Sequence, residues 1–432
     1  MSASLETLDG LERRLTLNLN AAAVETEVNK RLQRLARNVR LDGFRPGKAP
    51  MKMVAARYGS EVRGEVLGEN LQQAFGDAIR EQNLHVAGYP RFAPVQGEGA
   101  GGAFTATFEV FPEIRVGDLS QIQVTRPVVE VADVDIDRTL DILRKQRLHY
   151  HAVERAGQEG DRLHIDYLGR IGGEPFPGGE AKDFPVVLGE GRTLKDFEGA
   201  LAGMKAGEKK TFDVVFPEDY FAKDIAGKTA TFEAEVKSVH EPHLPEVDEA
   251  FAASMGIHEG GVAKMREEIA NNLRREVKRR VLAKVKEQVM QGLLDTSPFD
   301  VPKGLVTMEI RALMEKAVAD LKARGMKEQD IKLKDEIFEA QAKRRVALSL
   351  LLSEIARAND IKAGVDQVKG MVEEFAQSYE DPSDVVAWYY QDAQRLQEAE
   401  SLVLEENVVN WVLGQAQVTD ENMSLDKLMG RA

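Results

Sequence analysis

The chain has 432 residues, of which 43% are hydrophobic, 30% charged and 6% aromatic, a composition typical of a folded protein with two to four domains of about 100–200 residues each. It has no cysteine, which excludes disulfide scaffolds, thiolate metal sites and cysteine nucleophiles. No stretch approaches the ~20 apolar residues of a transmembrane helix, and residues 1–6 lack the basic and apolar parts of a secretory signal, so we expect a cytoplasmic protein without membrane contact.

The formal net charge of −14 is unevenly distributed along the chain. Residues 1–112 hold 14 basic and 13 acidic side chains, whereas the rest of the chain holds 44 and 59. Within residues 24–64 there are 10 basic and 4 acidic side chains. A local basic patch on an acidic chain predicts one anionic docking site and argues against a general nucleic-acid-binding protein.

The first 112 residues are predicted to form an α+β module that ends near Pro112. Residues 11–20 alternate between apolar and polar side chains, which indicates a strand. Apolar residues then recur at helical spacing, and a helical pattern resumes at about 51–82. Residues 103–111 alternate again and predict a second strand. The apolar stripe of the first helix consists of Val24, Val28, Leu32, Leu35 and Val39.

A loop at residues 43–50 separates these two helices. Its two glycines and two prolines in eight residues exclude a continuous helix. Its tip offers one apolar ring, Phe44, and two cations, Arg45 and Lys48, which suit a partner's pocket and phosphate groups. The alternative is an ordinary turn with solvated charges.

Residues 113–149 look like a connector, with an extended piece at 122–131 and a helix at 134–148 that has Asp133 as its N-cap. From Val153 to Val239, short alternating runs are separated by glycine-rich turns, with one helix candidate at 194–201. This pattern predicts a small, mostly antiparallel β domain around a helix. The runs lie at 163–167, 184–188, 211–216 and 229–239.

From Asp248 onward the pattern is almost entirely helical, with helices expected at 303–324, 335–358, 365–378 and 384–417. No catalytic constellation is visible there, and His243 and His258 stand isolated, so no metal site is expected. Most apolar rows, and the cluster Trp388-Tyr389-Tyr390, are predicted to be core. Three flexible methionines can instead line an exposed apolar surface, namely Met308, Met314 and Met326.

The β domain resembles the FKBP-type prolyl isomerases in four segments that occur in the same order, at 160–169, 188–201, 203–208 and 216–220. The resemblance implies an apolar pocket that favours the twisted form of an X–Pro bond, with no nucleophile, metal or cofactor. Phe197 would be its floor, where many relatives have Trp, and Pro177 stands where smaller FKBPs carry Asp. The implied pocket residues are Tyr167, Phe176, Phe184, Leu194, Phe197 and Tyr220. Without the resemblance, these side chains would be interpreted as the core of a small β domain.

The loop resembles the G-F-R-x-G-x-x-P signature of the trigger factor family, whose fixed positions are matched by Gly43, Phe44, Arg45, Gly47 and Pro50, with Lys48 inside the motif. The likeness extends over nearly the whole chain and implies an α+β multidomain protein. Its parts would be a ribosome-binding domain (1–112), a linker packing on the helical body (113–149), an FKBP-type isomerase domain (150–242) and an all-α chaperone body with arms (243–432).

The resemblance implies a ribosome-associated chaperone that binds nascent and unfolded polypeptides, keeps them folding-competent, including for export, and isomerises X–Pro bonds. Its docking partner would be the large ribosomal subunit near the exit tunnel, through protein and ribosomal RNA. A homodimer off the ribosome is left open. The alternative is a free FKBP-type isomerase with a helical dimerisation region and no ribosome role.

Overall fold

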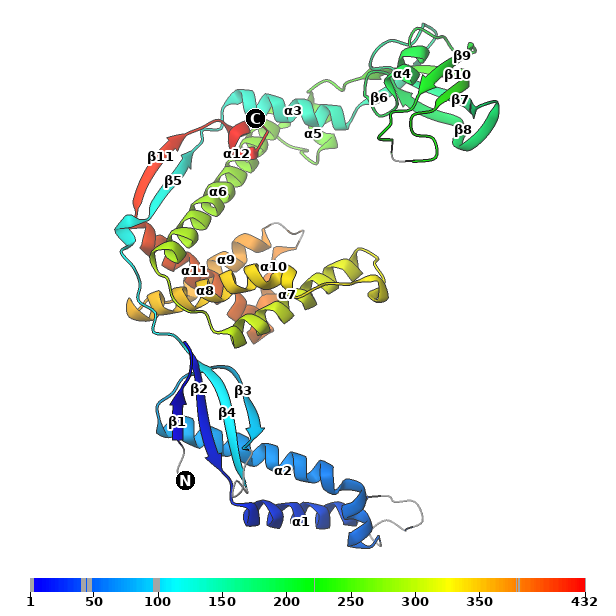
Figure 1. The fold of residues 1–432 in the computed structure, drawn as a ribbon. Coiled ribbons are helices and arrows are strands. Elements are labelled where there is room, and N and C mark those ends of the chain that lie inside the picture. Colours follow the sequence, from blue (N-terminus) through cyan, green and yellow to red (C-terminus); the bar gives the residue numbers. More distant parts are fainter. Residues whose placement is uncertain are drawn as a thin grey trace. The chain divides into compact units, whose positions relative to one another are not determined.

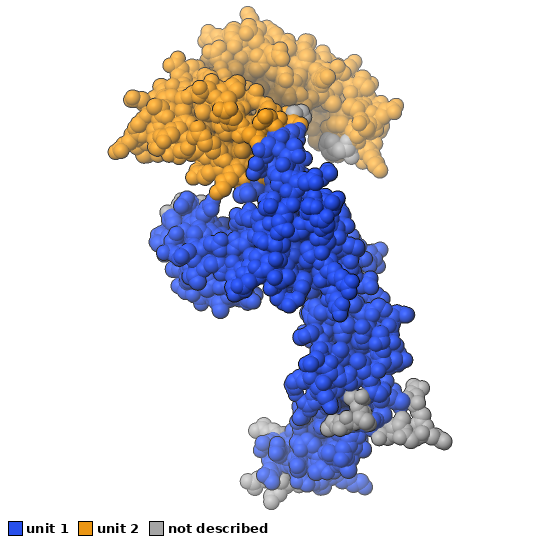
Figure 2. Space-filling model, turned by 90° about the vertical axis from the view of Figure 1, so that its left-hand side faces the viewer, with its two compact units in different colours: residues 1–126, 282–421 blue, residues 127–281, 422–432 orange. Residues whose placement is uncertain are grey.

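The computed structural model describes residues 4–39, 44, 49–95, 102–220, 222–377, 379 and 381–431 (Figure 1). The chain divides into two compact units (Figure 2). Unit 1 comprises residues 1–126 and 282–421, and unit 2 comprises residues 127–281 and 422–432. None of the described helices is both long and apolar enough to span a lipid bilayer.

The N-terminal module of unit 1 contains a four-stranded antiparallel sheet in the order β1-β2-β4-β3. The sequence predicts β2 and β4 but misses β1 and β3, because β1 has only four residues and a register irregularity between Ala87 and Arg91 interrupts the alternation of β3. The strands are β1 (Ser4–Thr7), β2 (Glu12–Asn18), β3 (Val86–Pro94) and β4 (Ala103–Val110).

Helices α1 (Ala21–Asn38) and α2 (Met51–Glu81) complete this module as predicted. Asn20 caps α1, because its side chain accepts hydrogen bonds from the backbone N–H groups of Ala22 and Ala23. The buried stripe Val24, Val28 and Leu32 of α1 packs against Val54, Val62 and Val66 of α2. Arg31 of α1 pairs with Glu69 of α2, at 2.9 Å between Nη1 and Oε1. Three basic side chains on the opposite face of α1, Lys30, Arg34 and Arg37, are exposed.

The helical body of unit 1 contains the C-terminal part of α6 (Gly261–Thr296), which continues from unit 2, and five further helices. The helix predicted over 384–417 is divided in two, because Asp392 accepts a hydrogen bond from the N–H of Gln394 and caps a new helix. The five are α7 (Lys303–Ala323), α8 (Glu336–Ala358), α9 (Val365–Ala376), α10 (Pro382–Tyr390) and α11 (Ala393–Leu413). Two 3₁₀ turns, η1 (Leu119–Gln121) and η2 (Glu328–Asp330), also belong to this unit.

The prediction that Trp388, Tyr389 and Tyr390 are all core is wrong for two of them. Tyr389 packs against the apolar cluster of α9 and α11, but Trp388 and Tyr390 are about half exposed. The Arg395 guanidinium stacks 3.8 Å from the centre of the Trp388 ring and donates a hydrogen bond to its backbone carbonyl. The aromatic edge of α10 is thus presented at the surface.

A two-stranded sheet joins β5 (Gln123–Val128) to β11 (Gln417–Asn422), which is the one strand among the described residues after 243. Arg126 and Asp420 bridge the two strands, at 2.7 Å between Nε and Oδ1. The body is therefore helical apart from this single added strand.

In unit 2, α3 (Asp133–Gln146) packs through Ile136 and Leu140 against α5 (Glu249–Ser254) and the first part of α6. Asp133 is the first residue of α3 and not its N-cap. The cap position is Ala132, whose N–H donates to the Asp135 carboxylate. Near the end of the chain, α12 (Leu425–Met429) joins this group through an ion pair between Arg138 and Asp426.

The predicted β domain is a five-stranded antiparallel sheet in the order β6-β10-β7-β8, with β9 paired to β10, around the single helix α4 (Lys195–Leu201). The strands are β6 (His149–Val153), β7 (Arg162–Ile171), β8 (Glu174–Val187), β9 (Lys209–Val215) and β10 (Thr229–His243). The sequence does not predict β6. Its pairing with β10 sets His243 opposite His149, so His243 is not isolated as the sequence suggests.

Candidate functional site

One face of the β domain carries a continuous group of aromatic rings. Alternation along β7 and β10 turns Ile165, Tyr167 and Phe232 toward α4, while their sequence neighbours point to the other face. Phe197 in α4 is 6% exposed and faces the same group. The structure thus brings the predicted pocket residues together around the start of one short helix.

The ring distances show how closely these side chains meet. Tyr167 lies edge-on to Phe184 and to Phe197, with centroid separations of 5.6 and 5.5 Å. Phe176 joins the group through Phe216 at 6.0 Å, and Tyr220 contacts Phe216 at 4.9 Å. Such edge-to-face contacts are the favoured geometry for aromatic pairs.

Phe232 belongs to this group although the pocket prediction omits it, as it also omits Phe212 and Phe216. Its ring lies 5.1 Å from that of Phe197 and 5.8 Å from that of Tyr167. The alternating run at 229–239 carries the signal, since Phe232 is its one aromatic side chain on the inward face. Gly169 is its partner across the strands, and a Cβ there would lie 2.5 Å from the Phe232 ring. Only glycine leaves room for this ring.

A buried carboxylate stabilises the loop that precedes α4. Glu198, 8% exposed, accepts hydrogen bonds from the N–H groups of Gly189 and Thr193 and from the Thr193 hydroxyl, at 3.0, 3.2 and 2.9 Å. Burial alone raises the pKa of Glu198, but these hydrogen bonds together hold it below its ordinary value. The ionised side chain therefore ties the 189–193 loop to the helix that carries Phe197, next to the half-buried Leu194.

A second buried carboxylate lies just before β7, where the backbone of Asp161 is hydrogen-bonded to Leu188 beside the same loop. Asp161 is 1% exposed and receives the Arg155 guanidinium, at 2.9 Å between Nη2 and Oδ1, and the N–H of Gln158 at 2.8 Å. Burial by itself raises the pKa of Asp161, but the hydrogen bonds and the charge of Arg155 outweigh it, so the pKa is lowered. Folding is thus coupled to ionisation of Asp161.

We expect Asp161→Asn to destabilise the β domain by about 2 kcal/mol at pH 7, because it leaves Arg155 without its buried carboxylate. A depressed folded-state pKa contributes stability above the unfolded pKa, which is about 3.9 for Asp, and this contribution is lost as the pH falls through the folded value. Amide hydrogen exchange in β7 and β10 should be faster in the variant at pH 7, and the difference should shrink in acid. The exposed Asp224→Asn is the matched control, and equal exchange in both variants would contradict the assignment.

The described members of the ring group are all uncharged, and Lys210, whose side chain turns to the same face, donates a hydrogen bond to the Ala200 carbonyl of α4. Burial raises the pKa of Tyr167, with a smaller effect of the nearby Tyr220, so its hydroxyl stays neutral and can donate a hydrogen bond. An apolar surface with one phenolic donor can grip a proline ring and remove water from the adjoining amide. This arrangement suits rotation about a bond and not bond cleavage.

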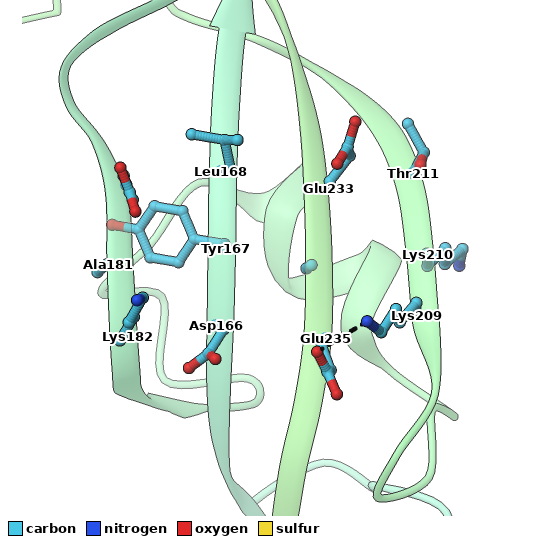
Figure 3. Close-up of a pocket in the computed structure, with 12 residues that line it drawn as sticks. Asp166, Tyr167, Leu168, Ala181, Lys182, Lys209, Lys210, Thr211, Glu233 and Glu235 are labelled. Atoms are coloured by element: carbon cyan, nitrogen blue, oxygen red, sulfur yellow. Dashed lines mark ion pairs between the residues drawn. The ribbon is translucent and has the colours of Figure 1, made fainter.

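The hollow shown in Figure 3 lies on the other face of the same sheet. Its wall is polar and carries charges of both signs, including an ion pair between Lys209 and Glu235. Tyr167, Ala181, Lys210 and Ala234 also line it, although strand alternation turns their side chains toward α4. The remaining residues of the wall are Asp166, Leu168, Glu180, Lys182, Lys209, Thr211, Glu233 and Glu235. The hollow thus shares Tyr167 with the ring group, but most of its lining is charged and lies on the other face of the sheet.

The loop at 43–50 is described only in part. Phe44 is 39% exposed, and Pro50 is the cap residue of α2. The predicted residues Gly43, Arg45, Gly47 and Lys48 lie outside the described part of the chain. On the neighbouring helix α1, three basic side chains of the predicted patch are exposed, namely Lys30, Arg34 and Arg37.

Comparison with known proteins assigns the chain to a family. Residues 1–143 match "Bacterial trigger factor protein (TF)", and residues 261–414 match "Bacterial trigger factor protein (TF) C-terminus". The trigger factor of Chromobacterium violaceum is 52% identical over 100% of this chain and 99% of its own length. The chain belongs to the trigger factor family. The trigger factor of Aromatoleum aromaticum is 50% identical over 100% of both chains.

Residues 153–237 of this trigger factor family member match "FKBP-type peptidyl-prolyl cis-trans isomerase", which covers the β domain and its ring group. The protein is accordingly a ribosome-associated chaperone with peptidyl-prolyl isomerase activity, and the alternative of a free isomerase without a ribosome role is not favoured. A solved structure titled "Promiscuous Substrate Recognition in Folding and Assembly Activities of the Trigger Factor Chaperone" covers 96% of this chain and 99% of its own, at 18% identity and a TM-score of 0.46.

Proposed function

We propose that the ring group on the inward face of the β domain is where X–Pro bonds are isomerised. The observation that carries this is the convergence of Tyr167, Phe197 and Phe232 within 6 Å of one another, beside α4. Rotation of a peptide bond must cross a barrier of about 18–20 kcal/mol, because the amide loses its resonance. An apolar surface that binds the twisted, less polar amide more tightly than the planar one lowers this barrier.

Each pocket residue then has a role that follows from its position. Phe197 forms the floor on which the proline ring rests, and Phe232 supports it from behind. Phe176, Phe184 and Leu194 form the walls, and Tyr220 closes the side next to Phe216. Tyr167, whose hydroxyl remains protonated, donates a hydrogen bond to a substrate carbonyl. No metal or cofactor is needed for this chemistry.

For the docking site we propose the loop at 43–50. The exposed Phe44 ring would enter a pocket of a protein on the large ribosomal subunit near the exit tunnel, and Arg45 and Lys48 would bind phosphates of the ribosomal RNA. Gly43, Gly47 and Pro50 would shape the loop. The exposed basic side chains of α1 would bind the same anionic surface of the ribosome. We further propose a cytoplasmic location and a homodimer off the ribosome.

We propose that the chain is divided into residues 1–112, 113–149, 150–242 and 243–432. Client binding is assigned to the last of these parts, the helical body. Its described part presents apolar side chains that remain substantially exposed although the helices have cores of their own. Several weak contacts of this kind add through multivalency and keep an unfolded chain open for folding or export. The exposed side chains include Met308, Met326, Ile337, Val365, Phe375, Trp388, Tyr390 and Leu402. Met314 is half-buried.

A deletion of residues 150–242 should abolish isomerase activity but leave protection of an unfolded client intact. His149 and His243 are paired across β6 and β10, so a short glycine-serine linker can join the ends left by the deletion. Light scattering of a denatured client after dilution measures the protection. The isolated module 149–243 is the counterpart and should isomerise prolyl peptides but protect poorly. Protection that followed the module would refute client binding by the helical body.

A further inference from the structure

Three histidines and one glutamate lie on one face of the ribbon formed by β6 and β10. In this antiparallel pair, Glu241 is directly opposite His151, and His243 is directly opposite His149. Residues directly opposite each other share a face, as do residues two apart on one strand. The four side chains therefore form a two-by-two group, which we call the histidine grid. All three of its imidazoles are exposed.

Two imidazoles of the histidine grid already have the spacing of metal ligands. The ring centroids of His151 and His243 are 5.4 Å apart, with an angle of 70° between the ring planes. Two imidazoles bound to one tetrahedral zinc through bonds of about 2.0–2.1 Å have ring centres about 5.2 Å apart. The observed spacing of 5.4 Å is close to this value.

The other members of the grid can complete a coordination sphere. In the conformations of the structure, no three His, Asp or Glu side chains among the described residues already converge on one point. His149 is exposed and free to rotate about χ1 toward its cross-strand partner His243. Glu241 accepts a hydrogen bond from Arg155 at 3.3 Å, so the two charges beside His151 offset each other. Imidazole ligands suit zinc, copper and nickel, and three of them form a known zinc ligand set.

We propose that the histidine grid binds a divalent transition-metal ion of the zinc type, with His151 and His243 as first ligands and His149 as the third. The chain enters the isomerase sheet at His149 and leaves it at His243. An ion bound here would clamp the two strands that connect the isomerase domain to the rest of the chain. This role is independent of proline isomerisation, since none of the grid residues belongs to the ring group.

A second histidine pair in the same sheet serves as an internal comparison. His164 and His240 have centroids 5.2 Å apart, but Arg162 is the cross-strand partner of His240, and its guanidinium stacks 4.2 Å from the centre of the neighbouring Tyr150 ring. A fixed cation at this position opposes binding of a second cation. His164 also forms a hydrogen bond with Asp183, at 2.9 Å between Nδ1 and Oδ1. We therefore place the ion on the grid and not on this pair.

The test is a titration of the full chain with zinc ions alone, in competition with a chromophoric chelator of known affinity. We expect one ion per chain with micromolar affinity, and a loss of at least about tenfold in both His243→Gln and His151→Gln, since each removes a ligand. His164→Gln and the distant His258→Gln are matched controls and should bind as the wild type does. Unchanged binding by His243→Gln, or equal loss in His164→Gln, would overturn the proposal.

A second measurement separates a clamp from scattered binding to surface carboxylates. Hydrogen exchange at the amides of β6 and of the end of β10 should slow on addition of zinc in the wild type and not in His243→Gln. Circular dichroism without metal confirms that the variant is folded. If zinc slowed exchange equally in both proteins, or nowhere in these strands, the ion would not be bound by the grid. Isomerase activity of all variants should remain at the wild-type level.

Discussion

Replacing Phe44, Arg45 and Lys48 together with alanine should weaken ribosome binding by at least about 100-fold, or roughly 3 kcal/mol. Phe44 is 39% exposed in the folded chain and contributes little to any core, so the fold should survive. A buried aromatic ring and cations that bind phosphates are side chains that often contribute most of the binding free energy of an interface. Co-sedimentation with ribosomes at low salt measures the effect.

The matched control removes one exposed ring and two exposed cations from the same module at other positions. Tyr89 is 81% exposed, and the side chains of Arg80 and Arg91 are 76% and 83% exposed. The variant Tyr89→Ala, Arg80→Ala, Arg91→Ala therefore changes composition equally but leaves the loop intact, and it should still co-sediment. Wild-type binding should weaken as salt rises, because phosphate contacts displace counterions. Normal co-sedimentation of the loop variant would remove the loop from the docking site.

Truncation of the pocket floor should strongly reduce catalysis. Phe197→Ala removes a ring that contacts both Tyr167 and Phe232, and we expect kcat/KM for a prolyl peptide to fall by at least about tenfold, which corresponds to about 1.4 kcal/mol of transition-state binding. The same change in a buried position costs about 3–5 kcal/mol of stability. Protease-coupled assay of a chromogenic prolyl peptide gives the rate, and chelation by EDTA should leave it unchanged.

Two further variants separate catalysis from folding. Phe197→Leu keeps most of the volume and should fold, but it lacks the flat ring and should remain slow. Val214→Ala creates a cavity in the same core, at a fully buried position outside the ring group, and should lower stability while the rate at permissive temperature stays near the wild-type value. Full activity of the folded Phe197→Leu protein would show that the pocket lies elsewhere.

Individual helices and strands could be predicted because their patterns depend on residues that are close in sequence. The spacing of Val24, Val28 and Leu32 defines α1, and two glycines and two prolines stop it before α2. The alternation of apolar and polar residues predicted β7 and β10, and the turns between them are rich in glycine. The edge strands β1, β3 and β6 were missed because β1 and β6 are short and a register irregularity interrupts the alternation of β3.

The sequence by itself determined most of the helices, the central strands and the two motifs that resemble the family, because periodicity and turn residues act within about ten positions. Only the tertiary structure decided which side chains meet across the sheets. Register between β7 and β10 placed Phe232 over Gly169 and made it part of the ring group. Register between β6 and β10 brought His149 and His151 to His243. Such contacts arise from pairing between strands far apart in the chain, so local periodicity gives the face on which a side chain lies but not its partner.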